Sequence, residues 1–150
     1  MVYLKKILVT TDLSQYSLEA LEYAESFSLL YASRIFLLHV EEHAHHRSED
    51  QAVAALAEFV PRNIDPDLKL TQVVRSGHPA AEIIKFSREE NVDLIVMATH
   101  GRTGVKHAVM GSVAEKVVRL SAVPVLTVKP LPVRESILHD EDIENELHLR

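Results

Sequence analysis

Three of the four glycines in the chain lie close together, between residues 98 and 112. They are Gly101, Gly104 and Gly111. Glycine lets backbone N–H groups approach a ligand that a Cβ would hold away, as phosphate binding requires. The segment leads into a helical pattern that begins near Ser112, and a helix N-terminus favours an anion. Arg102 and Lys106 add positive charge, so the segment predicts a phosphate site. A plain surface loop, with Ser112 only a helix cap, is the alternative.

Histidine is the second residue type here that could do chemistry. His43, His45 and His46 follow two glutamates, and imidazole is a common ligand of zinc and copper. Their spacing matches no closed metal site and no cysteine completes one, so we expect a solvated loop and assign no metal site. His39 lies in an apolar run, where a packed or backbone-bonded histidine is expected. His100, beside the glycines, is expected to contact phosphate when protonated or to be an exposed loop residue.

Composition and missing motifs exclude several classes of function. Against 16 Lys and Arg stand 22 Asp and Glu, so the net charge of -6 disfavours nucleic acid as a partner. No apolar run approaches the roughly 18 residues of a membrane helix and no secretory signal is evident, so we expect a cytoplasmic protein without a membrane partner. Motifs that place a nucleophile or catalytic base, such as G-x-S-x-G or H-E-x-x-H, are absent. We therefore assign no catalytic residue and expect at most slow hydrolysis.

Short apolar runs and helical spacings alternate along the chain. Strands are predicted around 7–9, 35–38, 68–74, 94–97 and 123–128, the third nearer an edge because it is less apolar. Helices are predicted at about 14–32, 48–60, from 79, and 112–121. Ser14 is expected to cap the first helix, and Ser112 and Glu115 to form a capping box on the fourth, with Leu120 facing inward.

This alternation requires right-handed parallel crossovers and predicts an open, doubly wound α/β sheet with helices on both faces. Such sheets bind ligands at the carboxyl ends of their strands. Composition changes after Pro130, so we expect one domain over residues 1–130 and an acidic tail over 131–150. Disorder of the tail is slightly favoured over a helix docked on a dimer or a partner.

The spacing of the glycine segment resembles that of the universal stress protein family. Those domains carry G-x-x-G-x(9)-G-S/T between the fourth strand and the fourth helix, which holds the phosphates of ATP in members that bind it. Gly101, nine residues, and Gly111-Ser112 match, whereas the first glycine is replaced by Ala98. The likeness covers residues 3–129 and includes 6–12, His39-Val40, 77–79 and 123–128.

The resemblance implies a strand order of 3-2-1-4-5 and a site for ATP, with magnesium able to bridge the phosphates. By this resemblance Asp12 binds the ribose hydroxyls or the adenine edge, and the backbone of Val40 contacts adenine. By the same resemblance, the glycine segment binds the phosphates. Its members are Ala98, Gly101, Arg102, Gly111 and Ser112. The family also implies a homodimer through antiparallel pairing of the last strands (Val123 to Val128), and a role as a stress-response sensor or regulatory switch with a protein partner still unknown.

Two alternatives remain open at the level of sequence. Asp12 could instead hydrogen-bond the N-terminus of the first helix. Ala98 would weaken binding if the position needs a positive φ or a very close approach of phosphate, and would cost little in ordinary strand geometry. If ligand binding is lost, the protein would be a dimeric interaction module that binds no nucleotide.

Overall fold

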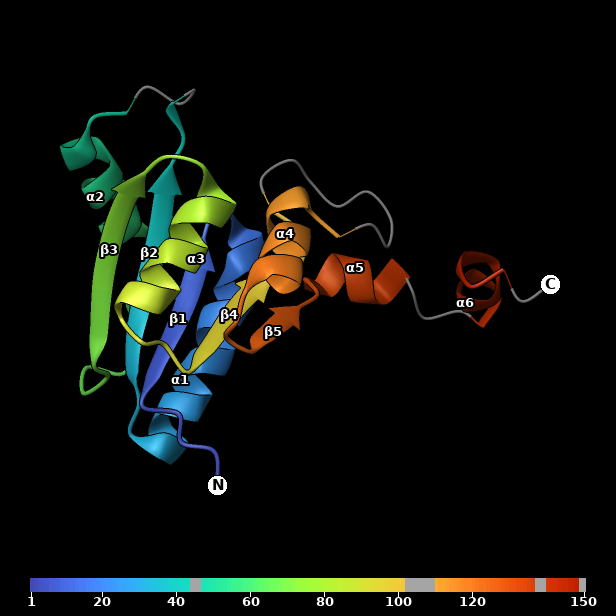
Figure 1. The fold of residues 1–150 in the computed structure, drawn as a ribbon, viewed down its shortest axis with the longest axis horizontal. Coiled ribbons are helices and arrows are strands. Elements are labelled where there is room, and N and C mark those ends of the chain that lie inside the picture. The colour runs from blue at the N-terminus through green and yellow to red at the C-terminus, as the bar shows by residue number, and fades with distance from the viewer. Residues whose placement is uncertain (44–46, 102–109, 137–139, 149–150) are drawn as a thin grey trace.

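The computed structural model describes residues 1–43, 47–101, 110–136 and 140–148, in which strands alternate with helices (Figure 1). The strands are β1 (Lys6–Thr11), β2 (Arg34–Glu41), β3 (Leu70–Ser76), β4 (Leu94–Ala98) and β5 (Val125–Val128). The helices are the 3-10 turn η1 (Gln15–Ser17), α1 (Leu18–Tyr31), α2 (Glu49–Phe59), α3 (Pro79–Glu89), α4 (Ser112–Leu120), α5 (Leu131–Ser136) and α6 (Asp140–Glu146). Within these ranges, no helix combines the length and the apolar character needed to cross a membrane.

The strands form one parallel sheet in the order β3-β2-β1-β4-β5. Both the predicted doubly wound α/β fold and the predicted strand order are confirmed. β1 is central and pairs with β2 on one side and β4 on the other. β3, the least apolar strand, lies at an edge as expected.

Helices cover both faces of the sheet, and successive residues of each strand point to opposite faces, so neighbouring residues are buried in different clusters. Leu8 of β1 packs in a cluster with α3 and α4, whereas its neighbours Ile7 and Val9 pack in a second cluster with α1 and α2. Figure 1 shows α3 and α4 in front of the sheet and α1 behind it. Each fully buried aliphatic side chain contributes about 1.5–3 kcal/mol by leaving water, so this central strand is a main source of stability.

The topology creates a crevice at the carboxyl edge of the sheet. From β1 the chain first builds β2 and β3 on one side, and then crosses to β4 and β5 on the other. The connections therefore diverge between β1 and β4, where open parallel sheets bind their ligands.

The first and fourth helices begin differently from the sequence prediction. Ser14 precedes η1, and its hydroxyl donates to Asp12 Oδ1 at 2.6 Å rather than capping a helix. The expected capping box of α4 is also absent, since Gly111 is the N-cap and Glu115 pairs with Arg119 at 3.6 Å. Ser14 thus stands at the N-cap of η1 without a capping side-chain bond, because its hydroxyl donates to Asp12. The capping-box prediction was wrong because α4 begins at Ser112 itself, which leaves Gly111 at the N-cap.

Helical spacing located the inward faces of the helices only in part. Ala114 and Val117 of α4 are buried, but Leu120, the last residue of the helix, is 60% exposed. In α2 the buried residues are Ala52 and Leu56.

The acidic tail contains two short helices, where disorder was slightly favoured. α5 is attached to the start of α1, because Glu19 accepts hydrogen bonds from the Leu131 backbone N–H at 3.1 Å and from Arg134 Nη2 at 2.8 Å. Figure 1 shows α6 farther from the sheet than α5. The α5 part of the tail is thus docked on its own chain.

Candidate functional site

A cavity of about 340 Å³ lies at the carboxyl edge of the sheet. Its walls come from the ends of β1, β2 and β4 and from the first turns of α3 and α4. Every predicted binding residue that the structure describes lines it. They are Asp12, Val40, Ala98, Gly101, Gly111 and Ser112. Arg102 lies outside the described residues.

Asp12 occupies a tight turn directly after β1. Its Oδ1 accepts hydrogen bonds from the Ser14 backbone N–H at 3.0 Å and from the Ser14 hydroxyl at 2.6 Å. Leu13 between them has a φ of 67°, a left-handed conformation that is strained for a residue with a side chain. The carboxylate therefore holds the start of the first helical segment, as the alternative interpretation proposed, and also lines the cavity.

Gly101 is a glycine because Asp12 leaves no room for a side chain. A Cβ built on Gly101 would overlap Asp12 Oδ2 and lie 3.3 Å from Asp12 Cγ. Any larger residue would have to displace the carboxylate. The start of the glycine segment and the end of β1 are therefore packed directly against each other across the cavity.

Gly111 brings the far end of the glycine segment back to β4. Its N–H donates to the Thr99 carbonyl at 2.6 Å, and a Cβ on Gly111 would lie 3.0 Å from that oxygen. Gly111 is the N-cap of α4 and has no side chain to accept from the first turn. The N–H groups of residues 112–114 have no helical acceptor, and all three residues line the cavity.

Ala98 has the backbone of an ordinary strand residue. It ends β4, pairs with Val128 of β5 and is absent from the positive-φ residues of the described chain. Alanine therefore fits the conformation without strain.

The cavity combines an apolar wall with polar groups and an anion-attracting helix end. Leu38, Val40, Pro79, Ile83 and Met97 form the apolar wall. The charged side chains among its described lining residues are Asp12 and Glu42, both acidic. Positive potential within the described part of the site therefore comes from the N-termini of α3 and α4, whose first turns line the cavity. This arrangement suits a ligand that carries a flat apolar ring, hydroxyl groups and an anionic group.

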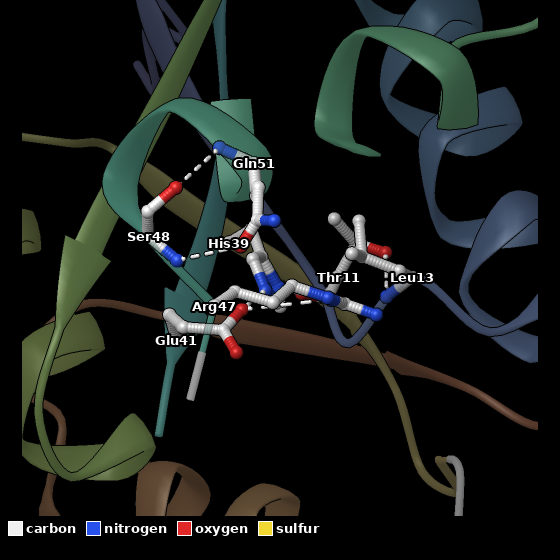
Figure 2. Close-up of polar contacts among 7 residues, drawn as sticks. All are labelled: Thr11, Leu13, His39, Glu41, Arg47, Ser48 and Gln51. Atoms are coloured by element: carbon white, nitrogen blue, oxygen red, sulfur yellow. Dashed lines mark hydrogen bonds and ion pairs between the residues drawn. The ribbon is translucent and has the colours of Figure 1, made fainter. Parts of the chain in front are cut away.

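A buried polar network, shown in Figure 2, lies beside the cavity. His39 Nδ1 lies 2.9 Å from the Thr11 carbonyl oxygen, which confirms the backbone-bonded histidine. Its Nε2 lies 3.0 Å from Glu41 Oε2, to which Arg47 Nη1 approaches within 3.5 Å. Sequence reasoning missed Glu41, although its spacing of two from His39 in a strand places both on one face.

The histidine cluster falls mostly outside the described residues. His43 is described and exposed, whereas His45 and His46 are not described. Among the described residues, no three His, Asp or Glu side chains are arranged to hold a metal ion.

Comparison with known proteins gives consistent matches over most of the chain. The sequence profile described as the universal stress protein family matches residues 4–129. The universal stress protein MJ0577 of Methanocaldococcus jannaschii is 33% identical over 156 residues, which cover 85% of this chain and 96% of that protein. Its solved structure superposes with a TM-score of 0.73 at 34% identity and covers 85% of this chain and 97% of that one.

Two further solved structures share the fold at lower identity. A universal stress protein in complex with cAMP has a TM-score of 0.68 at 22% identity, covering 86% of this chain and 98% of its own. The universal stress protein from Archaeoglobus fulgidus in complex with dAMP has a TM-score of 0.65 at 19% identity, covering 86% and 100%.

Proposed function

The chain belongs to the universal stress protein family, and from that premise we propose that it binds ATP at the carboxyl edge of its sheet. We further propose that it acts in the cytoplasm as a dimeric sensor or regulatory switch in the stress response. The observation that carries the proposal is the convergence of Asp12, Gly101 and the N-terminus of α4 on one cavity.

Each part of the cavity matches one part of a nucleotide. The apolar wall around Val40 is suited to adenine, and the Asp12 carboxylate to the ribose hydroxyls. The N–H groups of residues 112–114 and the backbone at Gly101 are suited to phosphates. Magnesium would be held by the phosphates of ATP rather than by a carboxylate cage. The complexes of two family members with cAMP and dAMP support an adenine nucleotide as the class of ligand.

The strand geometry of Ala98 supports nucleotide binding over the ligand-free interaction module. That alternative requires a position whose backbone conformation only glycine adopts without strain. Because Ala98 adopts an ordinary strand backbone, its methyl group imposes no backbone strain on the site.

The exposed edge of β5 supports the proposed dimer. β5 is the last strand of the sheet, and Val125, Leu126 and Thr127 are half-buried. Antiparallel pairing of two such edges would cover the backbone groups that an edge strand presents. A conformational change at the cavity could then be transmitted to the dimer interface.

Thermal unfolding of nucleotide-free protein with Mg-ATP and with Mg-GTP tests the proposal. A ligand at about 100 times its Kd adds about 2.7 kcal/mol, and we expect a rise of several degrees in Tm with ATP and less with GTP. Asp12→Asn keeps the oxygen that accepts from Ser14 but presents an amide to the ligand. It should weaken ATP binding by about tenfold or more in calorimetry, the loss of a hydrogen bond to a charged group.

Asp67→Asn is the matched control, because Asp67 is an exposed acid on the loop before β3. It should bind ATP as the unmodified protein does. Absence of a Tm shift with every nucleotide, together with no nucleotide released from the purified protein, would contradict ATP binding and favour the interaction module.

A further inference from the structure

A buried histidine beside the cavity bridges two hydrogen-bond acceptors. His39 is 3% exposed and Glu41 4% exposed. One ring nitrogen of His39 contacts the Thr11 carbonyl and the other contacts the Glu41 carboxylate, at 2.9 and 3.0 Å (Figure 2). The proposed contacts with the nucleotide use neither His39 nor Glu41.

The two contacts fix the number of protons that the pair must hold. A carbonyl oxygen only accepts, so His39 Nδ1 carries a hydrogen. The contact between Nε2 and Glu41 then needs a second hydrogen, either on Nε2 of an imidazolium or on the carboxyl of Glu41. A neutral imidazole beside an ionised carboxylate has one hydrogen for two acceptors and loses one of the contacts. The geometry therefore requires one dissociable proton shared between His39 and Glu41.

One of these contacts supports the turn that carries Asp12. The Thr11 carbonyl belongs to the residue directly before Asp12. The hydroxyl of Thr11 accepts from the Leu13 N–H at 2.9 Å and lies 2.6 Å from the Ser17 hydroxyl. His39 is thus bonded to the base of a turn whose conformation is strained at Leu13. Loss of this contact would free the turn to relax.

The other contact joins β2 to the segment that enters α2. Arg47 Nη1 lies 3.5 Å from the same oxygen of Glu41 that His39 contacts. Ser48, the next residue, caps α2 by accepting from the Gln51 N–H at 3.2 Å (Figure 2). The pair therefore links the Asp12 turn to the entrance of α2.

Charged and titratable groups surround the pair on several elements. Those beside it or on the cavity wall are Asp12 after β1, Glu42, His43 and Arg47 after β2, and His100 after β4. α2 adds the exposed Glu49 and Asp50, whereas the register partners on β3, Val74 and Ser76, are uncharged. Arg47 favours negative charge on Glu41. A test of the pair must therefore separate its proton from those of the neighbouring groups.

We propose that His39 and Glu41 are positioning residues that hold one proton between them and thereby fix the Asp12 turn for the nucleotide. Nucleotide affinity then falls when the pair loses this proton. This inference rests on the proposed function, and it adds a form of regulation by pH that the nucleotide site alone does not provide.

Glu41→Gln tests the proposal because it replaces the proton-dependent contact with a permanent one. The amide of glutamine donates to Nε2 of a neutral His39, whose Nδ1 hydrogen still serves Thr11. As pH rises from about 6 to about 9, the affinity of the unmodified protein for Mg-ATP should fall by about fivefold relative to that of Glu41→Gln, the effect of one hydrogen bond. Glu58→Gln, at an exposed position on α2, makes the same chemical change away from the pair and should keep the pH profile of the unmodified protein. Because the phosphates of ATP also titrate near neutral pH, the difference between variants is the readout.

Nitrogen NMR of the imidazole rings measures the proton without nucleotide. In the free protein, the Nδ1 hydrogen that His39 donates to the Thr11 carbonyl should disappear in one step as pH rises, because the one remaining ring hydrogen then lies between Nε2 and the ionised Glu41. The Asp12 backbone amide should shift with it. In Glu41→Gln, His39 should keep only its Nδ1 hydrogen and the Asp12 amide should stay constant. A neutral His39 beside an ionised Glu41 throughout would overturn the shared proton.

The outcomes distinguish this inference from the proposed function. If ATP binds and the unmodified protein and Glu41→Gln have the same pH profile of affinity, the positioning role is wrong while the proposed function stands. If no nucleotide binds at any pH, the proposed function is wrong. The Asp12 amide then decides whether the pair positions the turn, since it must respond to the proton in the unmodified protein and not in Glu41→Gln.

Discussion

Gly101 and Asp12 are in close contact at the cavity, although they are far apart in the chain. The position of Gly101 is determined by the carboxylate that faces it, because a Cβ would overlap Asp12 Oδ2. The requirement for glycine here comes from space and not from an unusual backbone dihedral angle. Such a requirement can be tested by changing both partners.

We expect Gly101→Ala to lower the free energy of unfolding by about 1–3 kcal/mol, the cost of overpacking. In an Asp12→Ala background, where the overlapping atoms are gone, the same substitution should cost much less. Urea unfolding of the four proteins measures this coupling. Equal costs in both backgrounds would show that the clash with Asp12 is not the cause.

Ala98→Gly is expected to lower stability without creating a better site. Glycine within a strand costs about 0.5–1 kcal/mol relative to alanine, and Ala98 already has strand geometry. ATP affinity should stay within about twofold of that of the unmodified protein, well below the tenfold that corresponds to 1.4 kcal/mol. Calorimetry and thermal unfolding check both parts. Markedly tighter binding by Ala98→Gly would identify the methyl group as an obstacle to the ligand.

At the residue scale the sequence predicted which residues line the cavity better than it predicted their local partners. The glycine spacing identified Gly101 and Gly111, because both are required by close backbone approach. Glu41 was missed because a charged residue at the end of a strand is normally exposed, and its burial depends on contacts with His39 and Arg47.

Among the elements, β3 and α3 are joined by a cluster of charges on the side of the sheet away from His39. Arg75 of β3 donates to Glu89 of α3 at 2.6 Å, lies 3.7 Å from Glu82 and stacks 5.0 Å from the centre of the Phe86 ring. The hydrogen bond from Arg75 lowers the pKa of Glu89, and the same bond raises the pKa of Arg75. The pair therefore makes this contact between the two elements dependent on pH.

The lowered pKa of Glu89 predicts the direction of an effect on stability. A carboxylate whose pKa is depressed on folding stabilises the protein above its unfolded pKa, and this contribution is lost as pH falls through the folded pKa. The stability difference between the unmodified protein and Glu89→Gln should therefore be present at neutral pH and disappear in acid. Because Glu89 is exposed, the difference will be small and sensitive to salt. Urea midpoints across acid pH measure it, and a difference that persists unchanged in acid would contradict the assignment.

Apolar runs predicted the strands well because strands covered on both faces contain few polar residues. Helix ends were predicted less well, since periodicity gives the face of a residue but not whether a packing partner covers that face in the last turn. Leu120 has the correct spacing to face inward, yet it is exposed at the end of α4. The cap of that helix depends on Gly111, which is held against Thr99 by tertiary contact.

For the molecule as a whole, the proposed dimer depends on the outer edge of β5. The carbonyls of Pro124 and Val128 accept from Ile95 and Thr99 on the β4 side. Because hydrogen-bonding groups alternate along a strand, the N–H of Thr127 faces the outer edge. Thr127→Pro should therefore remove an outward donor without breaking the pairing with β4.

We expect Thr127→Pro to convert the dimer to a monomer in light scattering while keeping the circular dichroism of the fold. Gln72→Pro is the matched control on β3, the opposite edge. The carbonyl of Lys69 accepts from Ile35 of β2, so the N–H of Gln72 faces outward in the same way. Gln72→Pro should remain dimeric. A dimer that survives Thr127→Pro would place the interface elsewhere.

The central position of β1 has a consequence for synthesis of the protein. β1 is made before the other strands of the sheet, but its second neighbour, β4, follows only after β2 and β3. Until then one edge of this central, buried strand has no partner. The cavity is also incomplete, because Asp12 meets Gly101 only when β4 has joined the sheet. A nucleotide in the proposed site would therefore stabilise the finished protein but would not assist the nascent chain, which depends on its own hydrophobic contacts until the fourth strand is in place.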